Sequence, residues 1–134
     1  MADQSSPISW TTTKQKLTAT STCNAEYVAL SAAVDETLYL QQLLSDIDMK
    51  NINFVPANLF SKLDPNIKLP DKTEIDKNAK HIFVRYYHIR DHLGTDIVLK
   101  HIPGNSNLAD TFTKPLSRDL FKRYSDMLRG FERV

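Results

Sequence analysis

The side chains that could bind a metal or act as a nucleophile are few. His88 and His92 are four residues apart in a stretch of helical periodicity, a spacing at which two histidines can share a metal ion. No third ligand is evident, which favours two surface histidines. Cys23 is the only cysteine, so no internal disulfide can form and a reducing compartment is expected. A helix start could activate this thiol, but a partly buried, inert thiol is the simpler interpretation.

A stretch of basic and aromatic residues between positions 77 and 92 is the strongest nucleic-acid candidate. Cations contact phosphates, and aromatic rings stack on bases or sugars. The residues that we expect to contact nucleic acid are Lys14, Lys80, Arg85, Tyr87, His88 and Arg90. Asp76, Asp91 and Asp96 dilute this charge, so an ordinary charged helix face, with Ile82, Tyr86 and Ile89 in the core, is the alternative.

The composition is that of one globular domain. The chain has 134 residues, of which 41% are hydrophobic and 25% charged, and its net charge is +1. This charge argues against bulk electrostatic binding to nucleic acid and leaves a local basic face as the option. No apolar run approaches the ~20 residues of a membrane helix, and the first residues do not resemble a secretory signal. We expect an intracellular protein, nuclear or cytoplasmic, with no membrane partner.

Apolar spacing predicts alternating strands and helices after a disordered leader at residues 1–7. The expected strands cover 8–16, 52–61 and 97–102, and the expected helices cover 23–48, 78–92, 107–113 and 117–130. Ser21 or Thr22, Asn105 or Ser106, and Ser117 are the expected helix caps, while Gly94 and Gly130 end helices. The last helix should turn Leu120, Phe121, Tyr124 and Leu128 to the core. This order favours an α/β layered fold over residues 8–134, a small mixed sheet of about three strands flanked by helices.

Several separate motifs occur in a fixed order along the chain. They are Ile8-Ser9-Trp10, Lys14-Gln15, Thr20-Ser21-Thr22, Ala25-Glu26-Tyr27, Lys80-His81-Ile82, Arg85-Tyr86, His101-Ile102-Pro103, Leu108-Ala109-Asp110 and Thr113-Lys114-Pro115-Leu116. In order and spacing, over residues 8–129, they resemble the RNase H domain of copia-type retrotransposons. The resemblance implies an RNase H-like fold whose first two strands lie upstream of Ile8, so that we expect them to be missing here.

The resemblance also implies a chemistry, which is cleavage of the RNA strand of an RNA–DNA hybrid by two divalent metal ions held by four carboxylates. Hard oxygen ligands suit magnesium. Glu26 matches the second carboxylate of the family and Asp110 matches the fourth. His101 lies near the histidine that many of these enzymes carry upstream of the last aspartate.

Two of the four family carboxylates are not found. The first belongs to the upstream strand, and Lys62 stands where the third is expected. A slip of two residues would offer Asp64 instead, at the cost of the downstream register. An ammonium about 4 Å from a divalent cation is repelled by ~8 kcal/mol at an effective dielectric near 20. Lys62 could instead neutralise Glu26 and Asp110, so we expect these ancestral positions and His101 to be idle and no cofactor to be bound.

The leading hypothesis is a catalytically degenerate, domesticated RNase H-like domain that acts as an interaction module for nucleic acid or protein. The first alternative is an active, magnesium-dependent ribonuclease H that uses Glu26, Asp110 and Asp64. The second alternative is a regulator that interferes with the parent retrotransposon. An incomplete sheet leaves edges that invite pairing, so a homodimer or a partner that completes the sheet is expected.

Overall fold

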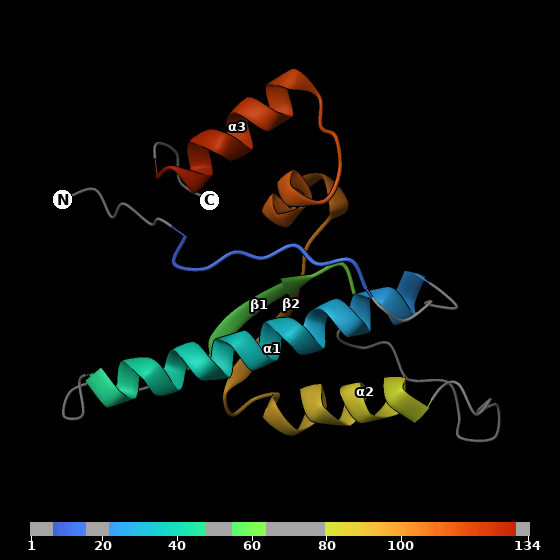
Figure 1. Ribbon diagram of the computed structural model, residues 1–134, viewed down its shortest axis with the longest axis vertical. Helices are drawn as coiled ribbons and strands as arrows, with labels where there is room; N and C mark the ends of the chain where they lie inside the picture. Colours follow the sequence, from blue (N-terminus) through green and yellow to red (C-terminus); the bar gives the residue numbers. More distant parts are fainter. Residues whose placement is uncertain (1–6, 16–21, 48–54, 64–79, 131–134) are drawn as a thin grey trace. The chain divides into compact units, whose positions relative to one another are not determined.

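The computed structural model describes residues 7–15, 22–47, 55–63 and 80–130. The chain divides into two compact units (Figure 1). The larger unit is Gln15–Gly104, and the smaller unit combines Met1–Lys14 with Asn105–Val134. Each unit is considered by itself below.

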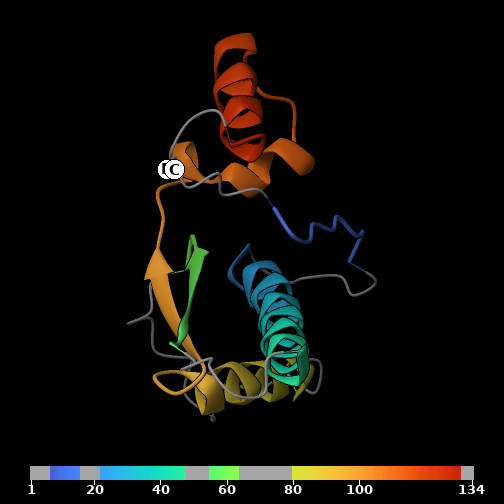
Figure 2. The same ribbon diagram turned by 90° about the vertical axis from the view of Figure 1, so that its left-hand side faces the viewer.

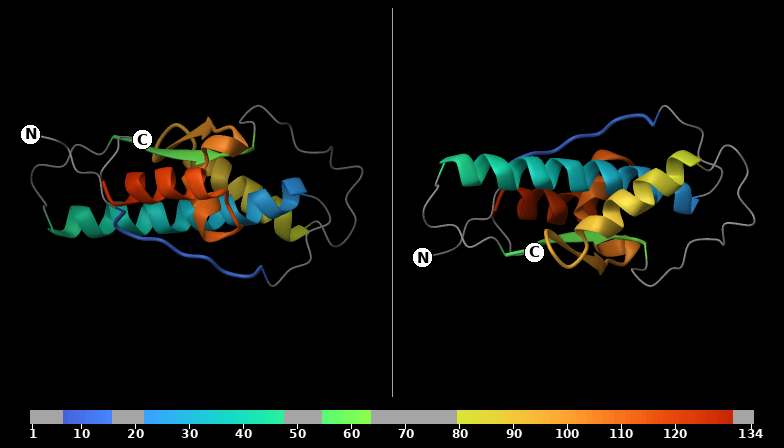
Figure 3. Two further views of the ribbon diagram at one scale, coloured as in Figure 1. Left: turned by 90° about the horizontal axis from the view of Figure 1, so that it is seen from above. Right: turned by 90° about the horizontal axis from the view of Figure 1, so that it is seen from below.

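The larger unit is built from two helices and two strands. In chain order these are α1 (Thr22–Ile47), β1 (Ala57–Ser61), α2 (Lys80–His92) and β2 (Ile97–His101). The strands pair in parallel, with Ala57 opposite Ile97 and Ser61 opposite His101. A parallel pair needs a crossover, and α2 lies within that connection. Figure 2 shows α1 alongside the two strands, and Figure 3 shows α2 crossing the N-terminal half of α1.

The core of the larger unit forms where α1 meets α2 and the sheet. The fully buried side chains are Val34 of α1 and Ile97 at the start of β2, both with 0% exposure. The other members of the core are Tyr27, Leu30, Leu63, Ile82 and Ile89. Apolar residues three and four apart place Tyr27, Leu30 and Val34 on one stripe of α1. The ring of Tyr27 meets that of Tyr86 edge to face, with centroids 5.9 Å apart.

A tight turn carries the chain from α2 into β2. Gly94 has a φ of 84°, a left-handed conformation that costs glycine little. Its N–H donates to the carbonyl of Ile97 over 2.9 Å, and the carbonyl of Asp96 accepts from the N–H of Ala57 over 3.0 Å. The turn therefore also starts the pairing of the two strands.

Three short elements form the described part of the smaller unit after residue 104. They are the 3-10 helices η3 (Gly104–Ser106, whose first residue belongs to the larger unit) and η4 (Leu108–Phe112), followed by α3 (Arg118–Leu128). The Asn107 side chain caps η4 by accepting from the N–H of Ala109 over 3.1 Å. Tyr124 of α3 is 2% exposed, and its hydroxyl donates to the carbonyl of Asn105 over 2.6 Å.

The expected helices are confirmed with small shifts in their ends, whereas the strands are confirmed only in part. Residues 8–15 carry no strand, so the described sheet has two strands instead of about three. The second expected strand starts at Ala57, directly after Pro56, because proline cannot donate to a strand ladder. The expected core residues Ile82 and Ile89 are buried, and Tyr86 packs against them. Residues 1–6, 16–21, 48–54, 64–79 and 131–134 lie outside the described residues.

Three details of the smaller unit differ from expectation. The cap of the short helix is Asn107, because its side-chain oxygen reaches the N–H of Ala109; neither Asn105 nor Ser106 has this role. Ser117 precedes α3 but makes no side-chain cap hydrogen bond. Phe121 is 53% exposed, since Tyr124 takes the inward position on α3.

Among the described residues, no helix is long and apolar enough to cross a membrane.

Replacing Ile97 by alanine should destabilise the larger unit strongly. The substitution leaves a cavity beside α1, and deletions of this kind cost about 2–5 kcal/mol. Urea denaturation followed by circular dichroism measures the loss. The matched control is Val98→Ala, at the next and more exposed position of β2, which should cost less than about 1 kcal/mol. Equal losses for the two variants would contradict this account of the core.

Candidate functional site

Lys62 lies at the carboxyl end of β1. The buried hydroxyl of Ser61 accepts a hydrogen bond from the N–H of Leu63 over 3.1 Å, which turns the chain around Lys62. The carbonyl of Ser61 accepts from the N–H of Ile102 over 2.8 Å, so the ends of β1 and β2 stay together. The Cε of Lys62 is 3.6 Å from the point that a Cβ would occupy at Gly104. The half-buried lysine chain therefore lies over the backbone that follows β2.

Two other predicted site residues belong to the same unit. His101 is the last residue of β2, stands opposite Ser61 in the register and is exposed. The strand pairing thus places His101 and Lys62 at the same edge of the sheet. Glu26 lies in the first turns of α1, directly before the buried Tyr27, and is half-buried. Asp64, the alternative third carboxylate, lies outside the described residues.

Asp110 is a buried carboxylate of the smaller unit. It is 6% exposed, and its Oδ2 is 2.7 Å from the Nζ of Lys114. Its backbone carbonyl accepts from the N–H groups of Thr113 and Lys114. Asp110 is therefore not a solvated surface acid, because the 3-10 turn folds the carboxylate inward and brings Lys114 to it. Asp110 and the pair Glu26 and Lys62 belong to different units, so their convergence stays a prediction.

Among the described residues, the side chains at these positions lack the carboxylate set of a two-magnesium centre. Such a centre needs several carboxylates around each ion, and a hard cation prefers oxygen ligands. Lys62 directly follows β1, and the ammonium of Lys114 pairs with the carboxylate of Asp110. Within the described residues of each unit, no three His, Cys, Asp or Glu side chains gather as a metal site would require.

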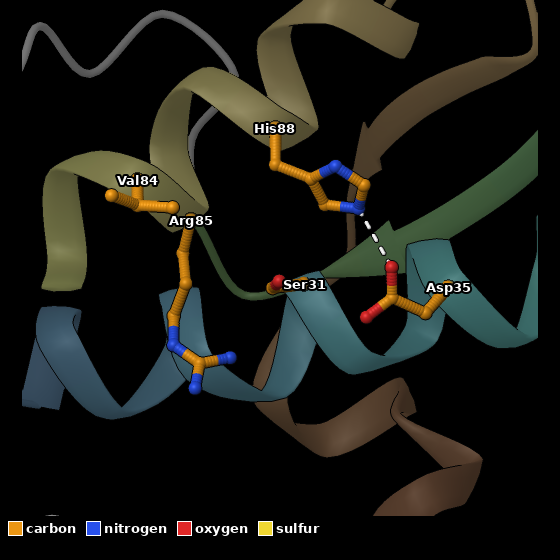
Figure 4. A pocket seen from close by; sticks show the side chains of 5 residues that line it. All are labelled: Ser31, Asp35, Val84, Arg85 and His88. Carbon is orange, nitrogen blue, oxygen red and sulfur yellow. Dashed lines mark hydrogen bonds and ion pairs between the residues drawn. The ribbon is translucent and has the colours of Figure 1, made fainter.

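A nucleic-acid surface on α2 would need its basic residues on one face of the helix, but the described basic residues lie on different faces. Arg85 and His88 extend toward α1 and line a hollow with Ser31, Asp35 and Val84 (Figure 4). The Nε2 of His88 is 2.7 Å from the Oδ1 of Asp35. Arg90 is exposed, but at 3.6 residues per turn it lies about 140° around the helix from Arg85.

The other predicted contacts with nucleic acid are dispersed. Tyr87 is 41% exposed, and its ring meets that of Tyr86 edge to face. Lys14 is exposed in the smaller unit. Lys80 begins α2, and its side chain lies outside the described residues. The described side chains of the larger unit therefore present separate basic residues rather than a continuous basic face.

Two histidine–aspartate pairs join the elements of the larger unit. His88 reaches Asp35 of α1, and the Nδ1 of His92 is 2.6 Å from the Oδ2 of Asp96 in the turn before β2. The carbonyl of Asp96 also accepts from the Nε2 of Gln41 over 3.1 Å. The spacing of four residues makes the His92 pair visible in the sequence, whereas 53 residues separate Asp35 from His88 and hide the other pair.

The hydrogen bond to His92 lowers the pKa of Asp96 below its usual value of 3.8, a shift that Thr95 supports and partial burial opposes. The two histidine rings meet edge to face with centroids 5.2 Å apart. These contacts give both histidines a structural role among the described residues, in line with the interpretation of the spacing as two surface histidines.

Comparison with known proteins places the sequence among retroelements. The chain is 29% identical over 129 residues, 96% of its length, to the retrovirus-related Pol polyprotein from transposon RE1 of Arabidopsis thaliana. It is 31% identical over 123 residues to that from transposon TNT 1-94 of Nicotiana tabacum, and 29% identical over 120 residues to that from transposon RE2 of Arabidopsis thaliana; these alignments cover 90% and 89% of the chain.

The similarity supports a retroelement-derived protein. The chain spans only 8–9% of the length of these polyproteins, so it corresponds to one small segment of them. No family model and no solved structure matches the chain. The retroelement origin expected from the motifs is thus confirmed at the level of the Pol polyprotein.

Replacing Asp96 by asparagine should lower the melting temperature in a pH-dependent way. Because the pKa of Asp96 is lower in the folded protein than in the unfolded chain, the carboxylate stabilises the fold above its unfolded pKa. This contribution is lost as the pH falls through the lowered, folded-state pKa. Melting curves between neutral pH and strong acid should therefore show a gap between wild type and Asp96→Asn that closes at low pH. The control is Asp91→Asn, an exposed carboxylate of α2 next to His92. A gap that widens in acid would contradict the assignment.

Proposed function

We propose that this protein is a retroelement-derived, RNase H-like domain that has lost metal-dependent cleavage and acts as an interaction module. The observation that carries the proposal is the position of Lys62. It follows β1 at the carboxyl edge of the parallel strand pair, where the motif order of the copia-type domain calls for a metal-binding aspartate.

Electrostatics explain why one lysine at this position matters. A divalent ion needs negative oxygen atoms around it, and an ammonium about 4 Å away opposes binding by ~8 kcal/mol at an effective dielectric near 20. Lys62 is half-buried and its stem lies along the backbone at Gly104, so this edge of the sheet holds a positive charge.

The partner of such a module is nucleic acid or another protein. Exposed Tyr87 and Arg90 on α2 support the first, because an aromatic ring and a guanidinium can both contact a nucleotide. The apolar side chains of Tyr39, Leu43 and Ile47, exposed near the end of α1, support the second. A module that engages the polyprotein of its parent element would act as a regulator, and co-precipitation with that polyprotein tests this version.

Magnesium titration followed by calorimetry tests the role of Lys62. The wild-type protein should show no saturable magnesium binding in the millimolar range. The dissociation constant of Lys62→Asp should be at least about tenfold below the limit set for the wild type, since ~1.4 kcal/mol of relieved repulsion is a factor of ten. Lys62→Gln is the matched control, because it removes the charge without adding a carboxylate. It should recover less binding than Lys62→Asp.

An assay on an RNA–DNA hybrid with magnesium or manganese tests the loss of cleavage. We expect the hybrid to stay intact with the wild-type protein. Cleavage that is abolished by Glu26→Ala and by Asp110→Ala would overturn the proposal and establish an active ribonuclease H.

The assembly state forms part of the proposal. The described sheet has two strands, and a small sheet with open edges gains hydrogen bonds by pairing with another chain. We expect gel filtration with multi-angle light scattering to give a dimer at micromolar concentration. A strictly monomeric protein would contradict the proposal that two copies pair through the sheet edge.

A further inference from the structure

The exposed side of α3 carries two cations and an aromatic ring within one helical turn. Arg118, Phe121 and Lys122 are three and four residues apart and so share one side of the helix. All three are exposed, Phe121 by 53%. In the described part of the chain, neither Arg118 nor Lys122 forms an ion pair. Like charges four residues apart destabilise a helix by a few tenths of a kcal/mol, a cost that a bound anion would relieve.

The opposite side of α3 is used within the smaller unit. Tyr124 is buried and bonded to the carbonyl of Asn105, while Leu120, Met127 and Leu128 are half-buried. The helix therefore separates its residues sharply into an inward apolar side and an outward charged side. Phe121 is the exception, a large apolar ring left outside beside the cations.

We propose that Arg118, Phe121 and Lys122 form a binding surface for single-stranded nucleic acid. The two cations contact neighbouring backbone phosphates, and the ring of Phe121 stacks on a base between them. Stacking requires an unpaired base with a free face, so a single strand fits better than a duplex. The surface is made of α3 residues and includes none of the basic and aromatic residues of α2.

The distribution of apolar residues favours nucleic acid over a lipid surface. An amphipathic helix binds a membrane by burying its apolar side in the lipid. In α3 that side packs inward, and the most buried side chain there is Tyr124. Only Phe121 remains for insertion, whereas both cations point to solvent and can reach phosphates.

This inference rests on the proposed function, since it names the partner of the interaction module. It makes no use of Lys62, Glu26 or Asp110. The loss of metal binding and the location of the nucleic-acid surface can therefore fail separately.

Fluorescence anisotropy with a labelled oligothymidine strand, repeated over a range of salt concentrations, tests the two cations. Each phosphate contact contributes about 0.7 to the slope of log K against log salt for a single strand. The double variant Arg118→Ala/Lys122→Ala should bind more weakly and reduce the slope by about 1.4. Arg123→Ala is the matched control on another flank of the same helix, and it should leave the slope near that of the wild type.

A second variant tests the ring. Phe121→Leu keeps an apolar side chain but removes the stacking face, so binding should weaken about tenfold with the salt slope unchanged. Because the replaced side chains are exposed, the melting temperature of each variant should stay that of the wild type. A shifted melting temperature together with weaker binding would assign these residues to folding and overturn the inference.

The remaining outcomes distinguish this inference from the proposed function. If the wild-type protein binds the strand and the double variant behaves as Arg123→Ala does, the surface lies elsewhere and only this inference fails. If the same variants lose binding to anionic vesicles while the strand does not bind, the surface is one for lipid and the inference is wrong. If neither a single strand nor an RNA–DNA hybrid binds, nucleic acid is excluded as the partner, and the magnesium titration still decides the role of Lys62.

Discussion

The packing of α1 against α2 and the strand pair is the contact on which the larger unit depends. Val34 and Ile97 are the fully buried side chains there, and the rest of the core surrounds them. A sheet of two short strands is marginally stable by itself and needs a helix to cover one face. Because α1 covers that face, the ends of β1 and β2 are held in a defined register. The positions of Lys62 and His101 follow from this packing.

The charges of the side chains at the carboxyl ends of β1 and β2 decide which ligands this edge of the sheet can bind. The scaffold ends two parallel strands side by side, an arrangement that can present side chains to a common ligand. Where an acid would attract a divalent ion, Lys62 places a cation whose stem lies along the backbone at Gly104. In the smaller unit, Asp110 is satisfied by Lys114 instead.

The basic residues of this protein make different contacts according to where the fold places them. On α2, Arg85 and His88 turn toward α1, where His88 bonds to Asp35 and stabilises the contact between the helices. On α3, Arg118 and Lys122 point outward beside an exposed ring. A net charge of +1 hides this difference, because it sums over residues that pack against other elements and residues that face solvent.

The sequence by itself determined the helices, the motif order and the retroelement relationship, because helix periodicity and capping are local and the motifs are contiguous. Three- and four-residue spacing was enough to find α1, α2 and the burial of Ile82 and Ile89. Only the tertiary structure decided which residues form strands, since pairing joins β1 to β2 across some 40 positions and residues 8–15 have no strand despite their β-favouring composition. It also decided that Asp110 is buried against Lys114 and that His88 meets Asp35. Burial and distant contacts depend on how elements pack together, and no local pattern specifies them.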